Sequence, residues 1–296
     1  MKSTVHCKLP KAGLGNQLFT LMKAVVFAHL NKLPLLVTHY HQLKIGPHLR
    51  REKIKRKYNG YFIFQKSIAG EFLDKLKLNF FKKSAFIKEP RVELLKKISN
   101  NCLYLFSEMP HWEHYFDGLK ENRKLVIELF PKLLSVEVLN SLKNKKTPCI
   151  GVHIRMGDFR KLKAGEDFSQ VGAVRTPENY FIKMIQEIRI IHGADLPVSV
   201  FTDGYRNEFD QLFYLKNIEL IEGNSDITDL LLLSSSQLIV TSAGSTFSYW
   251  AGFLSGAPII IHPDHIHTTI RGNNLFEGVF DADNPLLVQQ IKAIND

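Results

Sequence analysis

The sequence predicts an α/β fold whose C-terminal half is a doubly wound parallel sheet, and three observations support this class. Short apolar runs rich in β-branched residues alternate with segments of helical spacing, as in βαβ units. In the second half these runs are apolar throughout, which is typical of strands covered on both faces. The chain also opens with a run, a glycine turn, a helix and a second run. Right-handed crossovers between such strands place helices on both faces of the sheet.

The elements of the first half are less regular than those of the second. We expect strands at Thr4–Leu9, Pro34–Thr38, Tyr61–Phe64 and Cys102–Phe106, and helices up to Asn31 and at Glu71–Phe81, Arg123–Phe130 and Val136–Lys143. Residues 109–116 are rich in aromatic rings and imidazoles, which suits either sugar stacking or a partly buried aromatic loop. The polar residues 144–147 are typical of a linker, so we expect domains at residues 1–146 and 147–296.

The second half alternates strands and helices. We expect strands at Cys149–Ile154, Val198–Thr202, Ile218–Ile221, Leu238–Thr241 and Pro258–Ile261, and helices at Pro177–Ile191, Asn207–Leu215, Thr228–Ser234 and Thr246–Leu254. In an open α/β sheet, ligands bind at the carboxyl ends of the strands. The residues that follow each strand are therefore the first candidates for a site.

The strand ending at Ile154 delivers several polar side chains to that edge. Because side chains alternate along a strand, His153 and Arg155 should project together while Ile154 turns into the core. A guanidinium suits phosphate, since its planar fork donates two parallel hydrogen bonds and keeps its charge. Asp158 could orient Arg155 or a substrate hydroxyl. The alternative is a structural ion pair between Arg155 and Asp158.

Two further segments are typical of anion sites. Near the N-terminus, Gly13 and Gly15 precede or open a helix, with Asn16 at its N-cap or just inside it. Later, a strand runs through a small-residue turn at Ser245 into a helix. Asp203 follows another strand, before a glycine turn. The first segment matches neither the dinucleotide-binding fingerprint nor a Walker loop, because it lacks the third glycine and the Gly-Lys-Ser/Thr end.

Charge is distributed unevenly along the chain of 296 residues, 45% of them hydrophobic. Residues 1–146 hold 28 Lys and Arg against 11 Asp and Glu, and residues 147–296 hold 11 against 18, which gives the net charge of +10. Residues 50–57 are densest in basic side chains. Such a run attracts nucleic acid, anionic lipid or acidic glycan, but more often it is a solvated face. Without a nucleic-acid-binding signature, we expect no nucleic acid partner.

Other features bound the cellular context. No run reaches the ~20 apolar residues needed to cross a bilayer, and the N-terminus lacks the apolar stretch and cleavage site of a signal peptide. The three widely spaced cysteines indicate buried thiols in a reducing compartment. We therefore expect a cytoplasmic protein, and the basic first half suggests peripheral contact with an anionic inner membrane.

Three motifs resemble those of the α-1,2-fucosyltransferase family, glycosyltransferase family 11. They are Gly13-Leu14-Gly15-Asn16-Gln17-Leu18-Phe19, His153-Ile154-Arg155-Met156-Gly157-Asp158, and Asp226-Ile227-Thr228-Asp229 through Ser245-Thr246-Phe247-Ser248-Tyr249-Trp250. They stand in the family's order, and the resemblance covers most of the chain except roughly residues 42–148. The His-x-Arg-x-Gly-Asp motif is shared with other fucosyltransferases that use GDP-fucose. The first and last motifs point to the α-1,2-fucosyltransferase family within that group.

The resemblance implies a GT-B-like fold, with two Rossmann-like domains facing across a cleft. It implies that residues 147–296 bind the donor GDP-β-L-fucose and residues 1–146 the acceptor, without a metal or other cofactor and with inversion of the anomeric centre. Carried over by position, the catalytic residues would be Arg155, His153, Asp158 and Asn16. The donor-binding residues would be Gly13, Gly15, Asn16, His153, Arg155, Asp203, Asp229, Ser245, Thr246 and Phe247, with Arg155 on the diphosphate and Asp229 near the guanine.

Some positions depart from the family pattern. Met156 stands where a second arginine is common, Phe159 where tyrosine is, and Ala243-Gly244 replaces an asparagine-containing approach to the last motif. These changes bear on acceptor and linkage more than on the donor. The base that deprotonates the acceptor stays open among Asp158, Glu166 and Asp167.

Two groups of residues could instead form metal sites, and the sequence favours the fucosyltransferase assignment over both. Asp281 and Asp283 form an Asp-x-Asp pair in a polar turn, and His262, Asp264, His265 and His267 have spacings that zinc could use.

The resemblance therefore implies an inverting fucosyltransferase that acts on a galactose-containing oligosaccharide or lipid-linked precursor of a surface glycan, forming an α-1,2 linkage. The alternatives are a transferase for another GDP-sugar or linkage, and an inactive protein that binds glycan or nucleotide.

Overall fold

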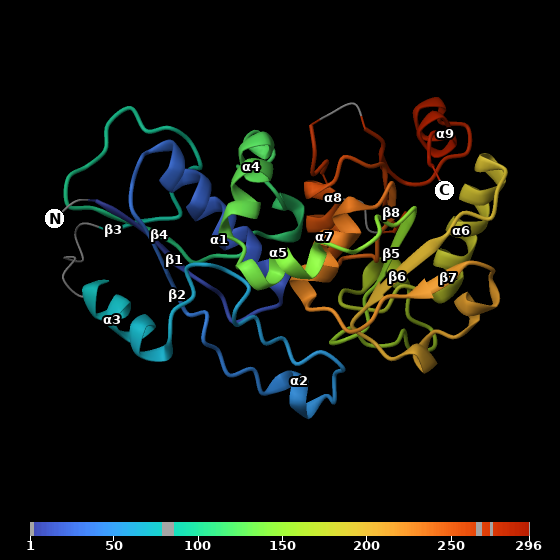
Figure 1. The fold of residues 1–296 in the computed structure, drawn as a ribbon, viewed down its shortest axis with the longest axis horizontal. Helices are drawn as coiled ribbons and strands as arrows, with labels where there is room; N and C mark the ends of the chain where they lie inside the picture. Colours follow the sequence, from blue (N-terminus) through green and yellow to red (C-terminus); the bar gives the residue numbers. More distant parts are fainter. Residues whose placement is uncertain (1–2, 79–85, 265–267, 273–274, 296) are drawn as a thin grey trace. The chain divides into compact units, whose positions relative to one another are not determined.

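Each half of the chain contains a parallel β-sheet, which confirms the predicted α/β class (Figure 1). The computed structural model describes residues 3–78, 86–264, 268–272 and 275–295. The chain divides into unit 1, residues 1–44 and 57–140, and unit 2, residues 45–56 and 141–296. Residues 45–56 thus belong to unit 2, although they lie within the first half of the sequence.

Unit 1 is built on a four-stranded sheet in the order β2-β1-β4-β3. Its strands are β1 (Thr4–Lys8), β2 (Leu35–Thr38), β3 (Phe86–Lys88) and β4 (Leu103–Phe106). The long helix α1 (Leu14–Leu30) connects β1 to β2 and buries most of its side chains against the sheet. The other helices are α3 (Ile68–Leu78) and α4 (Arg123–Leu133), and α5 (Val136–Leu142) spans the division between the units.

Unit 2 is built on a six-stranded sheet in the order β10-β9-β8-β5-β6-β7, and each of its strand pairs is parallel. Its strands are β5 (Ile150–Ile154), β6 (Val198–Thr202), β7 (Ile218–Leu220), β8 (Leu238–Val240), β9 (Ile259–Ile260) and β10 (Glu277–Gly278). Its helices are α2 (Gly46–Leu49), α6 (Glu178–His192), α7 (Asp226–Ser235), α8 (Thr246–Leu254) and α9 (Pro285–Lys292).

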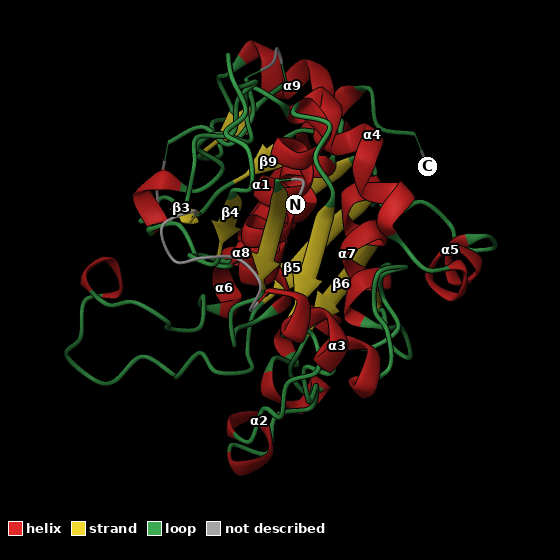
Figure 2. Ribbon diagram, turned by 90° about the vertical axis from the view of Figure 1, so that its left-hand side faces the viewer, coloured by secondary structure: helices red, strands yellow, loops and turns green. Residues whose placement is uncertain are grey.

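Helices cover both faces of the unit 2 sheet, with α6 and α9 on one face and α7 and α8 on the other (Figure 1). Ile150, Val152 and Ile154 of β5 pack into the core formed with α6 and α9. Gly151 faces the opposite way, because a Cβ placed there would lie 2.8 Å from Leu233 Cδ1 of α7. Figure 2 shows β5 and β6 running side by side in this sheet. The alternation of faces along β5 is what the sequence predicts.

The structure corrects two predicted elements. Residues 61–64 form only an isolated bridge between Phe62 and Leu134, and the neighbouring side chains of Tyr61 and Phe62 are both buried, so the segment does not alternate as a half-buried strand does. Residues 207–215 form two short 3₁₀ helices, Arg206–Glu208 and Gln211–Tyr214, instead of one α-helix. The end of the helix predicted at Glu71–Phe81, residues 79–81, lies outside the described residues.

None of the helices in the described part of the chain has the length and hydropathy needed to cross a lipid bilayer. Cys7, Cys102 and Cys149 are buried and unbonded to one another, as the sequence predicts.

Candidate active site

The order in which the chain adds strands to the unit 2 sheet reverses beside β5. From β5 the chain moves outward through β6 to β7, and α7 then returns it to β8 on the other side of β5. A reversal of this kind leaves a crevice at the carboxyl edge, where ligands bind in doubly wound sheets. His153 and Arg155 come from the end of β5, and Ser245 follows β8, so the topology brings these predicted residues to one place and adds Ser242 to them.

Arg155 is held between two carboxylates at this edge. Its Nη1 donates to Asp203 Oδ2 at 2.5 Å, and its Nη2 donates to Asp158 Oδ1 at 2.5 Å. Its backbone N–H donates to Ser242 Oγ at 2.8 Å, which ties the end of β5 to the turn after β8. The side chain remains 18% exposed. The guanidinium is therefore oriented and still accessible to a ligand, and the ion pair proposed as the structural alternative is also present.

Asp203 organises the turn that carries Arg155. Besides Arg155, it accepts hydrogen bonds through Oδ1 from the backbone N–H groups of Met156, at 2.7 Å, and Gly157, at 3.2 Å. The turns after β5 and β6 approach so closely that a Cβ on Gly157 would lie 2.3 Å from Asp203 Oδ2. A Cβ on Gly204 would lie 2.5 Å from Met156 Cγ. Both oxygens of Asp203 are thus engaged in positioning the motif.

Arg56 joins this network from the part of unit 2 contributed by the first half of the chain. Its Nη1 donates to Asp158 Oδ2 at 3.1 Å, and its Nη2 lies 2.9 Å from Asp158 Oδ1 and 2.8 Å from Glu52 Oε2. Glu52 in turn pairs with Arg50 at 2.6 Å. Arg56 has a backbone φ of 54°, a conformation that a non-glycine residue adopts at a cost.

Sequence reasoning did not find Arg56 or Glu52. It left residues 50–57 as either a surface for an anionic partner or, as such runs more often are, a solvated basic face. The only signal in the sequence is the single carboxylate, Glu52, inside that run. The structure buries Glu52 and most of the Arg56 side chain, so this segment carries structural ion pairs beside the motif.

The carboxylate of Asp158 is a weak base in this setting. Burial by itself would raise its pKa, but hydrogen bonds and charge from Arg56 and Arg155 outweigh burial and lower the pKa to about 2. Glu166 is bound by Arg160 at 2.6 Å, which lowers its pKa as well. Of the three carboxylates predicted as the base, these two are therefore held as ions by arginine.

His153 is buried and neutral. Burial lowers its pKa to about 3, and the charge of Arg155 acts in the same direction against the opposing charge of Asp203. Its ring stacks on Phe247 of α8 at a centroid distance of 4.8 Å, and Nδ1 lies 3.5 Å from Ser245 Oγ. A neutral, enclosed imidazole adds no positive charge beside Arg155. His153 therefore positions the start of α8.

The state of His153 predicts how stability depends on pH. The folded protein keeps the ring neutral down to about pH 3, whereas the unfolded chain binds a proton below about pH 6.5. The unfolded state thus binds more protons in this window, and stability falls as the pH falls. We expect His153→Asn to remove this contribution, on the order of 1 kcal/mol for each pH unit. Urea unfolding at several pH values checks it, and parallel pH profiles for the two proteins would contradict it.

The start of α8 places polar groups next to His153. Ser245 is the N-cap residue, but its side chain makes no cap hydrogen bond and lies toward the imidazole. Gly244, with a φ of 66°, donates its N–H to the Tyr249 hydroxyl at 2.8 Å. The predicted donor residues Thr246 and Phe247 form the first turn of α8, where backbone N–H groups and the helix dipole favour an anion.

Two carboxyl groups at the start of α7 have raised pKa values. Asp229 accepts a hydrogen bond from Asn224 Nδ2 at 2.9 Å, and burial raises its pKa to about 6. Burial and the charges of Asp229 and Asp203 raise the pKa of Asp226 to about 7. The sequence singled out Asp229, whereas Asp226 carried no role. The structure therefore adds Asp226 to the titratable groups at this edge.

The remaining predicted residues lie in unit 1. Gly13 is the N-cap residue of α1, and Gly15 and Asn16 lie in its first turn, so Asn16 is just inside the helix. The N–H of Leu14 donates to the Tyr58 hydroxyl at 2.9 Å. In the aromatic segment, Tyr115 stacks on Phe19 with ring centroids 5.1 Å apart. The segment also exposes Trp112, so it is only partly a core element.

The alternative metal residues are engaged in local contacts. His262 is buried against Tyr180, with ring centroids 4.5 Å apart, and its Nδ1 accepts the N–H of Asp264 at 3.2 Å. Asp281 Oδ1 accepts the N–H of Asp283 at 3.0 Å. His265 and His267 lie outside the described residues. Within the described ranges, no three His, Cys, Asp or Glu side chains are grouped to hold a metal ion.

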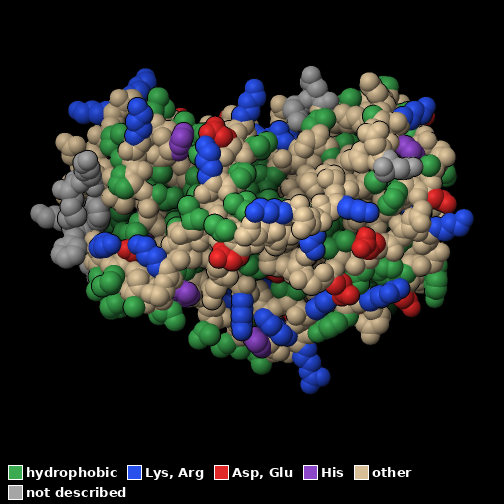
Figure 3. Space-filling model, in the orientation of Figure 1, with side chains coloured by type: hydrophobic (Ala, Val, Ile, Leu, Met, Phe, Trp, Pro, Cys, Tyr) green, Lys and Arg blue, Asp and Glu red, His purple; other side chains and the backbone are tan. Residues whose placement is uncertain are grey.

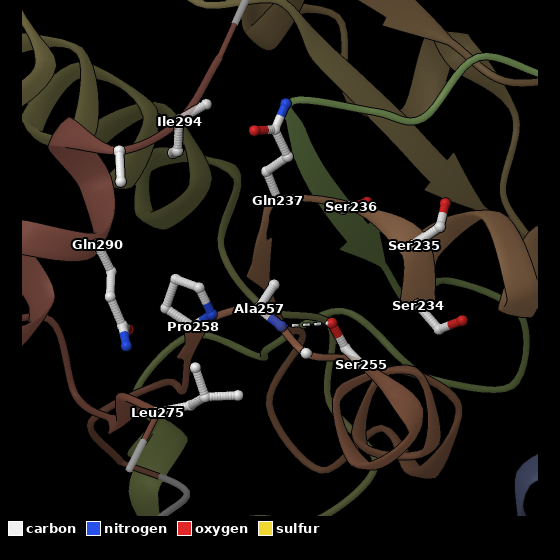
Figure 4. A pocket seen from close by; sticks show the side chains of 12 residues that line it. Ser234, Ser235, Ser236, Gln237, Ser255, Ala257, Pro258, Leu275, Gln290 and Ile294 are labelled. Carbon is white, nitrogen blue, oxygen red and sulfur yellow. Dashed lines mark hydrogen bonds between the residues drawn. The ribbon is translucent and has the colours of Figure 1, made fainter. Parts of the chain in front are cut away.

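A pocket of about 390 Å³ lies at the opposite, amino-terminal edge of β8 and β9 (Figure 4). Three of its lining hydroxyls have protein partners, because Ser234 and Ser235 donate to the Leu231 and Leu232 carbonyls and Ser255 accepts the N–H of Ala257, whereas the buried Ser236 Oγ has none among the described residues. None of the predicted site residues lines it. We therefore place the candidate active site at the carboxyl edge.

Comparisons with solved structures agree with this fold. The fucosyltransferase NodZ from Bradyrhizobium is 16% identical over 90% of this chain and 97% of its own, with a TM-score of 0.55. NodZ α-1,6-fucosyltransferase co-crystallized with GDP is 15% identical over 89% and 96%, with a TM-score of 0.54. POFUT1 in complex with GDP is 16% identical over 88% and 98%, with a TM-score of 0.51.

No curated protein sequence matches this chain. The model of the family described as glycosyl transferase family 11 matches residues 10–265, a range that contains all three motifs on which the resemblance rests. The resemblance is thereby confirmed, and the chain belongs to glycosyl transferase family 11.

Proposed function

We propose that this protein transfers L-fucose from GDP-β-L-fucose to a hydroxyl of a galactose-type residue, with inversion and without a metal ion, to form an α-1,2 linkage. Membership of glycosyl transferase family 11 supports glycosyl transfer, and GDP is present in structures of NodZ and POFUT1, which share the fold. The observation that carries the proposal is Arg155, fixed by two carboxylates at the sheet reversal and still accessible.

In the proposed reaction, the bond from fucose C1 to the phosphate oxygen breaks and its electron pair leaves with GDP. The negative charge that develops on the diphosphate is stabilised by Arg155 and by the first turn of α8 at Ser245, Thr246 and Phe247. These groups are already oriented, so little reorganisation accompanies charge development. We propose that the guanine binds near Asp229, that Gly13, Gly15 and Asn16 of unit 1 contact the fucose and phosphate, and that unit 1 binds the acceptor.

The acceptor hydroxyl attacks C1 from the opposite face and loses its proton. Asp158 is poorly suited to take this proton, because its pKa of about 2 makes it a weak base. We propose that the proton passes to solvent water, because a loose transition state needs little help from a strong base. His153 and Asp203 position the motif, and Arg56 holds Asp158 beside Arg155.

The test is a panel of donors and acceptors. GDP-fucose, GDP-mannose and UDP-galactose are each incubated with lactose or N-acetyllactosamine, with and without EDTA, and the product linkage is determined by NMR. We expect release of GDP from GDP-fucose only, unchanged by EDTA, and an α-1,2-fucosylated product. An α-1,6-linked product would contradict the proposed α-1,2 linkage, and loss of activity in EDTA would contradict the proposed metal independence. Binding of GDP without turnover would favour an inactive binding protein.

A further inference from the structure

Helix α3 of unit 1 buries carboxylates and exposes apolar side chains, which is the reverse of an ordinary surface helix. Glu71 and Asp74 are both buried. Glu71 accepts the backbone N–H groups of His39, at 2.5 Å, and His41, at 3.2 Å, which follow β2. It also pairs with Lys75 at 2.7 Å. Polar contacts, not apolar packing, thus attach this helix to the sheet.

The apolar side chains of α3 consequently point to solvent. The exposed fractions are 73% for Ile68, 59% for Phe72, 58% for Leu73 and 41% for Leu76. Ile68, Phe72 and Leu76 are spaced by four residues, so they form a continuous stripe along one side of the helix. Figure 3 shows hydrophobic side chains gathered over α3, which Figure 1 places at the periphery of unit 1. Surface helices of globular proteins normally bury this stripe.

Positive charge borders the same helix. Lys66 and Lys77 pair with Asp74 at 2.5 Å and 2.9 Å, and Lys75 pairs with Glu71, so three ammonium groups face two carboxylates. The surroundings add to this excess. Unit 1 contains 20 Lys and Arg against 10 Asp and Glu, and unit 2 contains 19 against 19, so the whole net charge of +10 belongs to unit 1. The exposed stripe therefore lies in the cationic part of the chain.

We propose that α3 binds the surface of a membrane that contains anionic lipids, with Ile68, Phe72, Leu73 and Leu76 inserted among the acyl chains and the lysines on the headgroups. An apolar stripe flanked by lysines is the pattern of helices that lie in the interface plane. The lysine stems can follow the apolar surface while their ammonium groups meet phosphate. The buried carboxylates of Glu71 and Asp74 keep α3 in this orientation before it meets lipid. The contact does not require fucosyl transfer, but it would bring the enzyme close to a lipid-linked acceptor.

The test is sedimentation of the full-length protein with vesicles, in the absence of donor and acceptor. One set of vesicles is phosphatidylcholine alone, and the other is phosphatidylcholine mixed with phosphatidylglycerol. We expect binding to the mixed vesicles, weaker binding to the neutral ones, and loss of binding as salt shortens the screening length. The double variant Phe72→Ser, Leu73→Ser should bind the mixed vesicles about tenfold or more weakly. Ile190→Ser on α6 of unit 2, where the side chain is 74% exposed, should bind as the wild type does.

Folding is followed by thermal unfolding of each variant, and Ile68→Ser provides a second change on the same stripe. Absence of wild-type binding to the mixed vesicles would overturn the proposal, as would equal binding by the wild type and the folded double variant. If the wild type is a dimer in light scattering that the double variant dissociates, with vesicle binding unchanged, the stripe is a contact between copies of this chain instead. Because no sugar transfer is measured, none of these results bears on the transferase proposal.

Discussion

Replacing Arg155 with alanine is expected to lower the kcat for fucosyl transfer about a thousandfold, the magnitude found when an oriented charge donor is removed from a transition state. The variant would also leave Asp158 and Asp203 facing each other without the cation between them, which we expect to destabilise the fold by about 2 kcal/mol. Steady-state kinetics with GDP-fucose and urea unfolding measure the two effects separately.

Arg160→Ala is the matched control, because Arg160 also pairs with a carboxylate, Glu166, in the same connection but with a side chain that is 41% exposed. We expect it to retain activity. Arg155→Lys keeps the charge and loses the planar fork, so an intermediate loss is expected. A folded Arg155→Ala protein with near-normal turnover would contradict the phosphate role and would favour the purely structural ion pair.

Replacing Gly157 with alanine should separate the geometry of the motif from its charges. The added Cβ would lie 2.3 Å from Asp203 Oδ2 and 3.2 Å from Arg56 Nη2, so the Asp203 carboxylate must move. That movement breaks its hydrogen bonds to the turn and displaces Arg155. We expect a loss of about a hundredfold in kcat/KM and about 2 kcal/mol of stability, as for other overpacked sites.

Gly172→Ala is the control for this change, since a Cβ on Gly172 would meet no heavy atom within 4 Å. Gly172 lies in the same connection between β5 and α6. Its variant should match the wild type in both kinetics and unfolding. Full activity in a folded Gly157→Ala protein would show that the close approach of the two turns does not set the position of Arg155.

The strands and helices of unit 2 were predictable because their periodicity is strong and their packing is local. Alternation along β5 gave the shared direction of His153 and Arg155, and the strand order then brings in Ser242 and Ser245. The prediction of one α-helix at residues 207–215 was wrong because apolar spacing alone does not distinguish an α-helix from successive 3₁₀ turns.

The partners of the motif could not be predicted in the same way. The contact between Arg56 and Asp158 spans about a hundred positions of sequence, and nothing local marks Arg56 among its basic neighbours. The pKa values of Asp158 and Asp226 move in opposite directions because of partners that only the fold supplies. Likewise, the spacing of α3 predicted a helix but not that its apolar side faces outward.

The division of the chain has a consequence for how the protein is made. The polypeptide passes between the units after residues 44, 56 and 140. During synthesis, Arg56 is therefore added long before Asp158, the residue with which it pairs. Two fragments cut at a single point after residue 146 would place Arg56 and Asp158 on different molecules: the first would hold all of unit 1, whereas the second would lack residues 45–56 and 141–146 of unit 2.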